Sequence, residues 1–221
     1  MAGARGQFLA DSGSCTEAIT WLSTNCDTCL HDFDERGPCI VQQFGPFGEV
    51  DHTRLFYGIY KTTFAYEDSS LGTYDIRSVR VFEQSSDSNF LRPVLTETGA
   101  DFVDRIEAPY LISSKEGSIL HIFMTGGNGG FDFGYYFLRD HDKWQQLNIP
   151  EWPTIFKKNV PDGYSFCRGG FVDFTTMKVG FPVFRPDDPC CCPTGGWVTA
   201  GLLIHGHDVL IDNAEYSPKT E

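Results

Sequence analysis

Cysteines are the side chains of this sequence with the widest range of possible chemistry, and they fall into two groups. The eight are Cys15, Cys26, Cys29, Cys39, Cys167, Cys190, Cys191 and Cys192. An even number is typical of a disulfide framework, although the sequence leaves the connectivity open. Structural zinc is the rival interpretation, because Cys26 and Cys29 have the Cys-x-x-Cys spacing of zinc ligands.

The second group of cysteines argues against zinc. Cys190, Cys191 and Cys192 are adjacent, so their side chains diverge and cannot all reach one tetrahedral ion, and a second Cys-x-x-Cys is missing. Disulfides are therefore favoured, and oxidised cysteines indicate the periplasm, the cell surface or the exterior. Cys167 could also be a nucleophile paired with a distant histidine, but no catalytic motif surrounds it, so a disulfide is its expected role.

A second group of residues suited to chemistry is His205, His207 and Asp208. Two histidines one residue apart on a strand point to the same side, which suits a divalent ion such as zinc or copper. One hypothesis is thus a metal-dependent hydrolase that uses His205 and His207. The alternative is an ordinary polar hairpin tip around Gly206, since no further ligands can be located in the sequence. We therefore predict no cofactor and leave a metal open.

Signatures of known enzymes are absent from the sequence. It has no Gly-x-Ser-x-Gly, no His-Glu-x-x-His, no phosphate-binding loop and no dinucleotide fingerprint. The net charge of −13 would repel nucleic acid and anionic membranes. No apolar run approaches the ~18 residues of a membrane span. These features favour a non-enzymatic protein that binds neither nucleic acid nor lipid, and they leave an enzyme open.

The elements that must position these residues are mostly strands. The 19 Phe, 9 Tyr, 23 Gly and 12 Pro suit half-buried strands joined by tight turns. We predict a mainly β fold, an antiparallel sandwich or curled sheet over about 50–215, stapled by disulfides. Strands are expected at 55–65, 76–83, 110–113, 118–125, 131–138, 144–149, 178–184, 197–204 and 209–211, with an irregular segment at 150–161.

One helix is expected near the beginning of the chain, at about 14–30. Ser14 and Glu17 have the spacing of a capping box, and apolar residues and cysteines follow at helical steps. Cysteines on its buried face suggest that the C-terminal group pins this helix to the rest of the fold. The length of 221 residues is consistent with one domain over 1–221.

Exposed aromatic residues next to a glycine-rich loop suggest a binding surface. Phe131 to Leu138 places aromatic rings at alternate positions, which predicts one aromatic face. We predict that Asn128, Tyr135 and Tyr136 meet a protein or glycan partner, because aromatic side chains dominate binding hot spots. The remaining hypothesis is a purely structural envelope protein.

The last third of the chain resembles a group of largely uncharacterised bacterial exported proteins and lipoproteins. The resemblance rests on Phe184-Arg-Pro-Asp-Asp-Pro-Cys-Cys-Cys-Pro-Thr-Gly-Gly196, where the group has Arg-x-x-Asp-x-x-Cys-Cys-Pro-Ser/Thr-Gly-Gly before a final hairpin. By that similarity Cys191 and Cys192 are the pair of the group, and Cys190 is an extra thiol that needs its own partner. The resemblance implies a bacterial, exported protein and no particular activity.

The first ten residues contain no apolar signal-peptide core, so the expectation of a periplasmic, secreted or envelope location depends on the cysteines. The sequence offers no basis for an oligomeric state.

Overall fold

The computed structural model describes residues 8–9, 39–65, 70, 72–85, 90–99, 103–126, 131–132, 134–167 and 169–219. The predicted helix at about 14–30 lies outside these residues, as do Cys15, Cys26, Cys29 and Asn128. Cys39 begins the second strand. In the part of the chain that the structure describes, no helix has the length and hydropathy of a membrane span.

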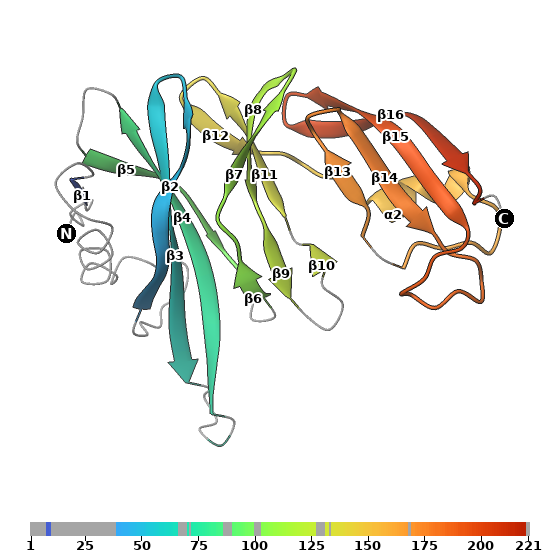
Figure 1. Cartoon of the computed structure of the whole chain (residues 1–221), viewed down its shortest axis with the longest axis horizontal. Helices are drawn as coiled ribbons and strands as arrows, with labels where there is room; N and C mark the ends of the chain where they lie inside the picture. The colour runs from blue at the N-terminus through green and yellow to red at the C-terminus, as the bar shows by residue number, and fades with distance from the viewer. Residues whose placement is uncertain are drawn as a thin grey trace. The chain divides into compact units, whose positions relative to one another are not determined.

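The prediction of a mainly β, disulfide-containing fold is confirmed (Figure 1). Four antiparallel sheets make up the described chain. The first, ordered β1-β5-β4-β3-β2, contains β1 (Phe8–Leu9), β2 (Cys39–Val50), β3 (Thr53–Ala65), β4 (Thr73–Ser85) and β5 (Phe90–Thr98). The second, β10-β9-β6, contains β6 (Val103–Ile106), β9 (Met124–Gly126) and β10 (Phe131–Asp132).

The other two sheets have four strands each. The third, β12-β11-β8-β7, contains β7 (Tyr110–Ser114), β8 (Gly117–Ile122), β11 (Tyr135–Asp140) and β12 (Lys143–Gln146). The fourth, β13-β14-β15-β16, contains β13 (Phe171–Asp173), β14 (Lys178–Val183), β15 (Gly196–His205) and β16 (Asp208–Ser217). Two-residue turns at 115–116, 141–142 and 206–207 close the hairpins β7–β8, β11–β12 and β15–β16, and the last of them is the hairpin tip expected around Gly206.

The chain divides into two compact units, each with its own buried residues. The first is drawn from Met1–Leu111 and Ile122–Gly134, and the second from Ile112–His121 and Tyr135–Glu221. Two compact units can still belong to one folding domain, so the single domain over 1–221 stays a prediction. In the first unit, residues 55–60 of β3 are buried on both faces of the strand.

The second unit is built from two sheets whose inner faces share one core. Strands β8 and β11 contribute Ile119, Tyr136 and Leu138, whereas β14 and β15 contribute alternate residues from Val179 to Leu202. The alternation along β15 explains why only every second residue reaches the core. Val198, Ala200 and Leu202 are buried, and the residues between them are more exposed. Burial on one face and exposure on the other is the pattern of a two-layer antiparallel fold.

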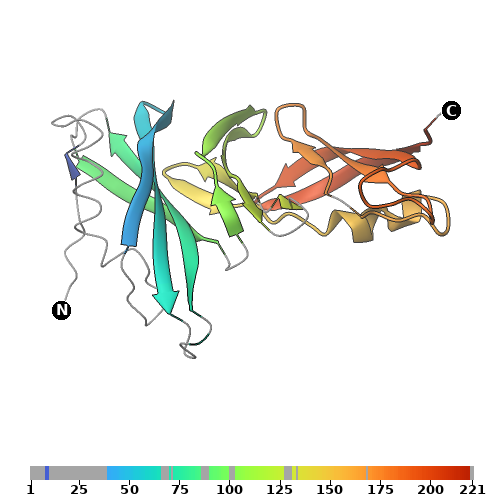
Figure 2. The ribbon, with the colours of Figure 1, turned by 60° about the horizontal axis from the view of Figure 1, so that its bottom comes forward.

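One short helix closes this core. The segment 150–161 was expected to be irregular, which is wrong: it contains α2 (Trp152–Phe156) and the 3₁₀ turn η3 (Lys157–Asn159). Pro153 is compatible with the helix because it lies in the first turn, where no backbone N–H partner is lost. Trp152 and Phe156 are buried in the core. Figures 1 and 2 both show α2 beside the β13–β16 sheet.

Candidate functional site

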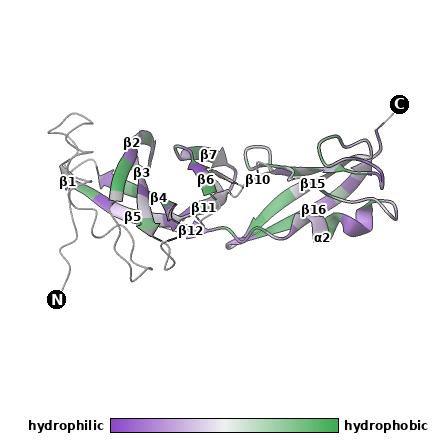
Figure 3. Cartoon of the chain, turned by 90° about the horizontal axis from the view of Figure 1, so that it is seen from below, coloured by the Kyte–Doolittle hydropathy of each residue, from purple (hydrophilic) through white to green (hydrophobic). Residues whose placement is uncertain are grey.

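The face of the β13–β16 sheet that points away from the core carries exposed apolar side chains. We call it the outer face; it comprises Phe171, Lys178, Trp197, Thr199, Leu203, Leu210, Asp212 and Glu215. Phe171, Trp197, Leu203 and Leu210 keep 47%, 45%, 42% and 48% of their surface exposed. Figure 3 shows hydrophobic stretches along β15, consistent with apolar residues on both faces of this strand.

The aromatic end of the outer face is a packed ring pair. The rings of Phe171 and Trp197 have centroids 6.0 Å apart and planes inclined by 50°. Phe171 pairs with Gly180 across β13 and β14, and a Cβ at Gly180 would collide with the Phe171 ring. Glycine at this position therefore lets the ring lie flat on the sheet. The two rings hold each other in place and still expose about half of their surface.

The other end of the outer face is a pair of leucines. Leu203 and Leu210 are direct cross-strand partners in the β15–β16 hairpin. Between the leucines and the rings, Thr199 pairs with Glu215, and Gly201 pairs with Asp212. Six residues of strand from Trp197 to Leu203 span about 20 Å, and four strands span about 14 Å. The outer face is thus apolar at both ends and polar and acidic between them.

The loop that enters β15 has one disulfide within it and a second that links it to Cys167, and together they form a corner of the second unit. Cys167 is bonded to Cys190, and Cys191 is bonded to Cys192. A turn closed by the Cys192 N–H donating to the Pro189 carbonyl at 2.9 Å places Cys190 and Cys191 at its tip. Cys190, Cys191 and Cys192 are exposed.

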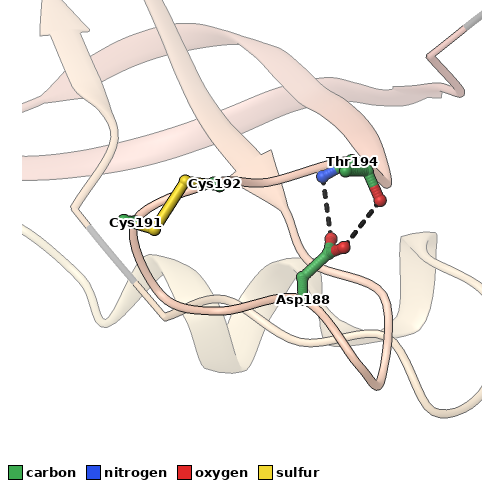
Figure 4. The surroundings of a disulfide bond; sticks show 4 residues. All are labelled: Asp188, Cys191, Cys192 and Thr194. Atoms are coloured by element: carbon green, nitrogen blue, oxygen red, sulfur yellow. Dashed lines mark hydrogen bonds between the residues drawn. A yellow bond between two sulfur atoms is a disulfide. The ribbon is translucent and has the colours of Figure 1, made fainter.

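Asp188 holds this corner together through its carboxylate. One oxygen accepts hydrogen bonds from the backbone N–H groups of Arg185 and Thr194, each at 2.7 Å, and the other accepts the Thr194 hydroxyl at 2.7 Å. Figure 4 shows the two hydrogen bonds between Asp188 and Thr194. The Thr194 hydroxyl is the main cause that lowers the Asp188 pKa below its usual value, and the backbone groups add to it. The carboxylate is therefore ionised at neutral pH and acts as a three-point clamp.

The corner also fixes the start of the two strands that carry the aromatic pair. Cys167 lies four residues before Phe171, and Cys192 lies five residues before Trp197. The Gly195 N–H donates to the Val183 carbonyl at 2.9 Å, and the Tyr216 hydroxyl donates to the Gly195 carbonyl at 2.6 Å. The start of β15 is thus tied to both of its neighbouring strands.

The predicted binding residues do not form an exposed aromatic surface. Tyr136 is 8% exposed; its ring stacks on His121 with centroids 4.1 Å apart and meets Phe174 edge-on at 4.9 Å. Tyr135 is half-buried. Phe137, which belongs to the aromatic face predicted for 131–138 and lies opposite Tyr136 on β11, is only 2% exposed. Both faces of this strand are covered.

The predicted metal ligands are not brought together. His205 and Asp208 are the last pair of the β15–β16 hairpin, and His207 lies in its turn. The Asp208 carboxylate instead accepts the Asn148 side-chain amide at 2.7 Å, and the His207 carbonyl accepts the Asn148 N–H at 2.8 Å. Among the described residues, no three or more His, Cys, Asp or Glu side chains have the geometry to hold a metal ion.

The disulfides correct one expectation about the cysteines and confirm another. All four cysteines of the C-terminal group are paired with one another, so none of them pins the predicted N-terminal helix, and none is free to bind zinc. The extra thiol, Cys190, has its partner in Cys167. Adjacent Cys191 and Cys192 bond to each other.

Sequence reasoning missed the outer face. A signal was present, because Trp197 and Leu203 lie on the same face of a strand that was predicted at 197–204. Neither of them was weighed as a binding residue. No model of a known protein family matches this chain, and no curated protein matches it either.

Proposed function

We propose that this protein is a non-enzymatic, exported binding module that docks a protein partner on its outer face. The observation that carries the proposal is the gathering of Phe171, Trp197, Leu203 and Leu210 on one face of one sheet. Single exposed apolar residues are ordinary on protein surfaces, but two apolar pairs on one sheet face, with polar residues between them, offer a partner two separate contact points.

The length of the outer face favours a protein partner over a glycan. The aromatic pair alone could stack on a sugar ring, but Leu203 and Leu210 lie about 20 Å from Trp197 along the strand and offer a sugar little. A peptide or a helix can contact both ends at once. Aromatic residues at one end and aliphatic residues at the other are features of a protein-binding patch.

The charge between the two ends favours a basic partner segment. Asp212 and Glu215 are exposed on the outer face, and Lys178 is the lysine there. The whole chain carries −13. The negative electrostatic potential of these charges speeds the approach of a positively charged partner, and added salt weakens it. We therefore expect a partner segment with apolar side chains flanked by Lys or Arg.

An exported location is supported by the two disulfides of the second unit. Disulfides persist in the periplasm, at the cell surface and outside the cell, and are rare in the cytosol. The corner that they form also fixes the start of β13 and β15, and so keeps the aromatic pair in place without a large core.

The test is selection of peptides from a displayed random library, with a glycan array run in parallel. Trp197→Ala removes the centre of the aromatic end, and Leu203→Asp/Leu210→Asp removes the leucine end. Ile40→Asp is the matched control, because Ile40 is a 58% exposed apolar residue in the first unit. We expect basic, apolar peptides whose Kd rises at least about tenfold with either outer-face variant and is unchanged by Ile40→Asp.

Two results would contradict the proposal. Glycan binding that is lost in Trp197→Ala and kept in Leu203→Asp/Leu210→Asp would replace the protein partner by a sugar at the aromatic end. Selected peptides that bind all variants equally would show that the outer face is not the binding surface.

A further inference from the structure

The two disulfides of the corner connect very different lengths of chain. Cys167 and Cys190 are 23 residues apart, so their bond closes a loop that contains β13 and β14. Cys191 and Cys192 are neighbours in sequence. A cross-link stabilises a fold mainly by restricting the unfolded chain, and this effect grows with the length of the closed loop. The Cys191–Cys192 bond closes almost no loop, and therefore adds almost nothing to stability by restricting the unfolded chain.

The Cys191–Cys192 bond is also open to solvent. Both residues are exposed, whereas the other disulfide joins exposed Cys190 to half-buried Cys167. Cys191 lies at the tip of the turn that the Cys192 N–H closes with Pro189. Exchange requires a thiolate to approach a disulfide sulfur, so access is one of the factors that set its rate. The geometry gives an incoming thiol a direct route to this pair.

The corner has other bonds that hold it when the Cys191–Cys192 bond is absent. Asp188 binds Arg185, which precedes the cysteines in sequence, and Thr194, which follows them (Figure 4 shows the contact with Thr194). The Cys167–Cys190 bond ties the tip of this turn to the segment that precedes β13. None of these contacts passes through the Cys191–Cys192 bond. Opening that bond therefore leaves the loop and the strand β15 in place.

We propose that Cys191 and Cys192 form a thiol–disulfide exchange site, and that Cys167 and Cys190 form the structural disulfide. The co-reactant is a dithiol, either a small molecule or a protein with a Cys-x-x-Cys pair. Its thiolate attacks one sulfur of the pair and forms a mixed disulfide, and its second thiol then displaces that sulfur. Two electrons and two protons pass to Cys191 and Cys192, which become thiols, and the dithiol becomes a disulfide.

This assignment is independent of the proposed binding function, because it uses no residue of the outer face. The native full chain is titrated with dithiothreitol and trapped with iodoacetamide. Trypsin then cuts after Arg168 and Lys178, which separates Cys167 from the other three cysteines unless its disulfide persists. We expect both Cys191 and Cys192 to be alkylated, on a peptide still linked to Cys167, at about a tenfold lower dithiol concentration than the Cys167–Cys190 pair needs.

The control is the double variant Cys191→Ser/Cys192→Ser. It should lose the alkylation at low dithiol, keep the Cys167–Cys190 link and unfold at nearly the same temperature. Reduction of the Cys167–Cys190 pair first, or of both pairs together, would overturn the assignment. So would alkylation of Cys191 and Cys192 before any dithiol is added, or a double variant that no longer folds.

Discussion

Acidification from pH 7 to pH 5 is expected to destabilise the protein through His121. This residue lies on β8 with 2% of its surface exposed, and its ring stacks on Tyr136 with planes inclined by only 3°. Burial disfavours the charged imidazolium and lowers the His121 pKa from 6.5 to about 4. The imidazole is therefore neutral in the folded protein over most of the accessible pH range.

The sign of the effect follows from the lowered pKa. In the unfolded chain His121 takes up its proton near pH 6.5, whereas in the folded protein it does so only near pH 4. Between these values the unfolded state binds more protons, so the free energy of unfolding falls as the pH falls. A pKa difference of one unit between the folded and unfolded states corresponds to about 1.4 kcal/mol of unfolding free energy. Between pH 7 and pH 5 the unfolded chain protonates His121 and the folded protein does not, so the free energy of unfolding falls by about 2 kcal/mol.

The assay is urea unfolding at pH 7 and pH 5, in the wild type and in His121→Phe. Phenylalanine keeps a flat ring against Tyr136 and cannot be protonated, so the variant should lose about 2 kcal/mol less on acidification than the wild type. Comparing the two pH dependences removes the contribution of other titrating groups, such as Glu97, whose pKa burial raises. His205→Phe, at an exposed position near the end of β15, is the control and should show the pH dependence of the wild type. Equal pH dependence in the wild type and His121→Phe would refute the reasoning.

Three further predictions concern the core, the start of β15 and the corner. Phe156→Ala should cost about 3–5 kcal/mol in urea unfolding, because the ring is fully buried and its loss leaves a cavity. Gly196→Ala should cost about 2–4 kcal/mol in the same assay, because φ is +107° and a Cβ would collide with the Ser217 carbonyl. Asp188→Ala should lower the Tm at pH 7, and less at pH 3, because the lowered Asp188 pKa makes its stabilisation vanish as the pH falls through the folded value. An unchanged Tm at pH 7 would show that the Thr194 contacts do not hold the corner.

Strand periodicity predicted much of the fold, and the exceptions have a physical cause. The strand expected at 55–65 is β3 (Thr53–Ala65), and the one expected at 76–83 is β4 (Thr73–Ser85). Strand β2 (Cys39–Val50) was not predicted, because Gly45, Pro46 and Gly48 normally mark turns. The structure accommodates them with register shifts next to Pro46 and Gly48. Such bulges allow glycine and proline in a strand and cannot be read from composition.

The cysteine pairing shows a different limit of the sequence. The argument that adjacent cysteine side chains diverge holds only for Cys190, which bonds to Cys167, because the sulfurs of adjacent Cys191 and Cys192 meet in a disulfide. The partner of Cys190 is 23 residues away, and only the antiparallel pairing of β13 with β14 brings Cys167 near it. A long-range disulfide is a consequence of topology, so it becomes predictable only after the strand order is known.

The failure to find the exposed outer face has the same origin. Strands β11 and β15 both carry large apolar residues at neighbouring positions, so the sequence offers no difference between Tyr136–Phe137 and Trp197–Val198. In β11 both faces are covered, and Tyr136 becomes a core residue. In β15 one face is left open, and Trp197 becomes an exposed one. Periodicity tells which residues share a face, but what covers each face depends on the other strands of the fold. An aromatic residue on a predicted strand is therefore a binding candidate only after its face is shown to be uncovered, and Trp197 meets that condition where Tyr136 does not.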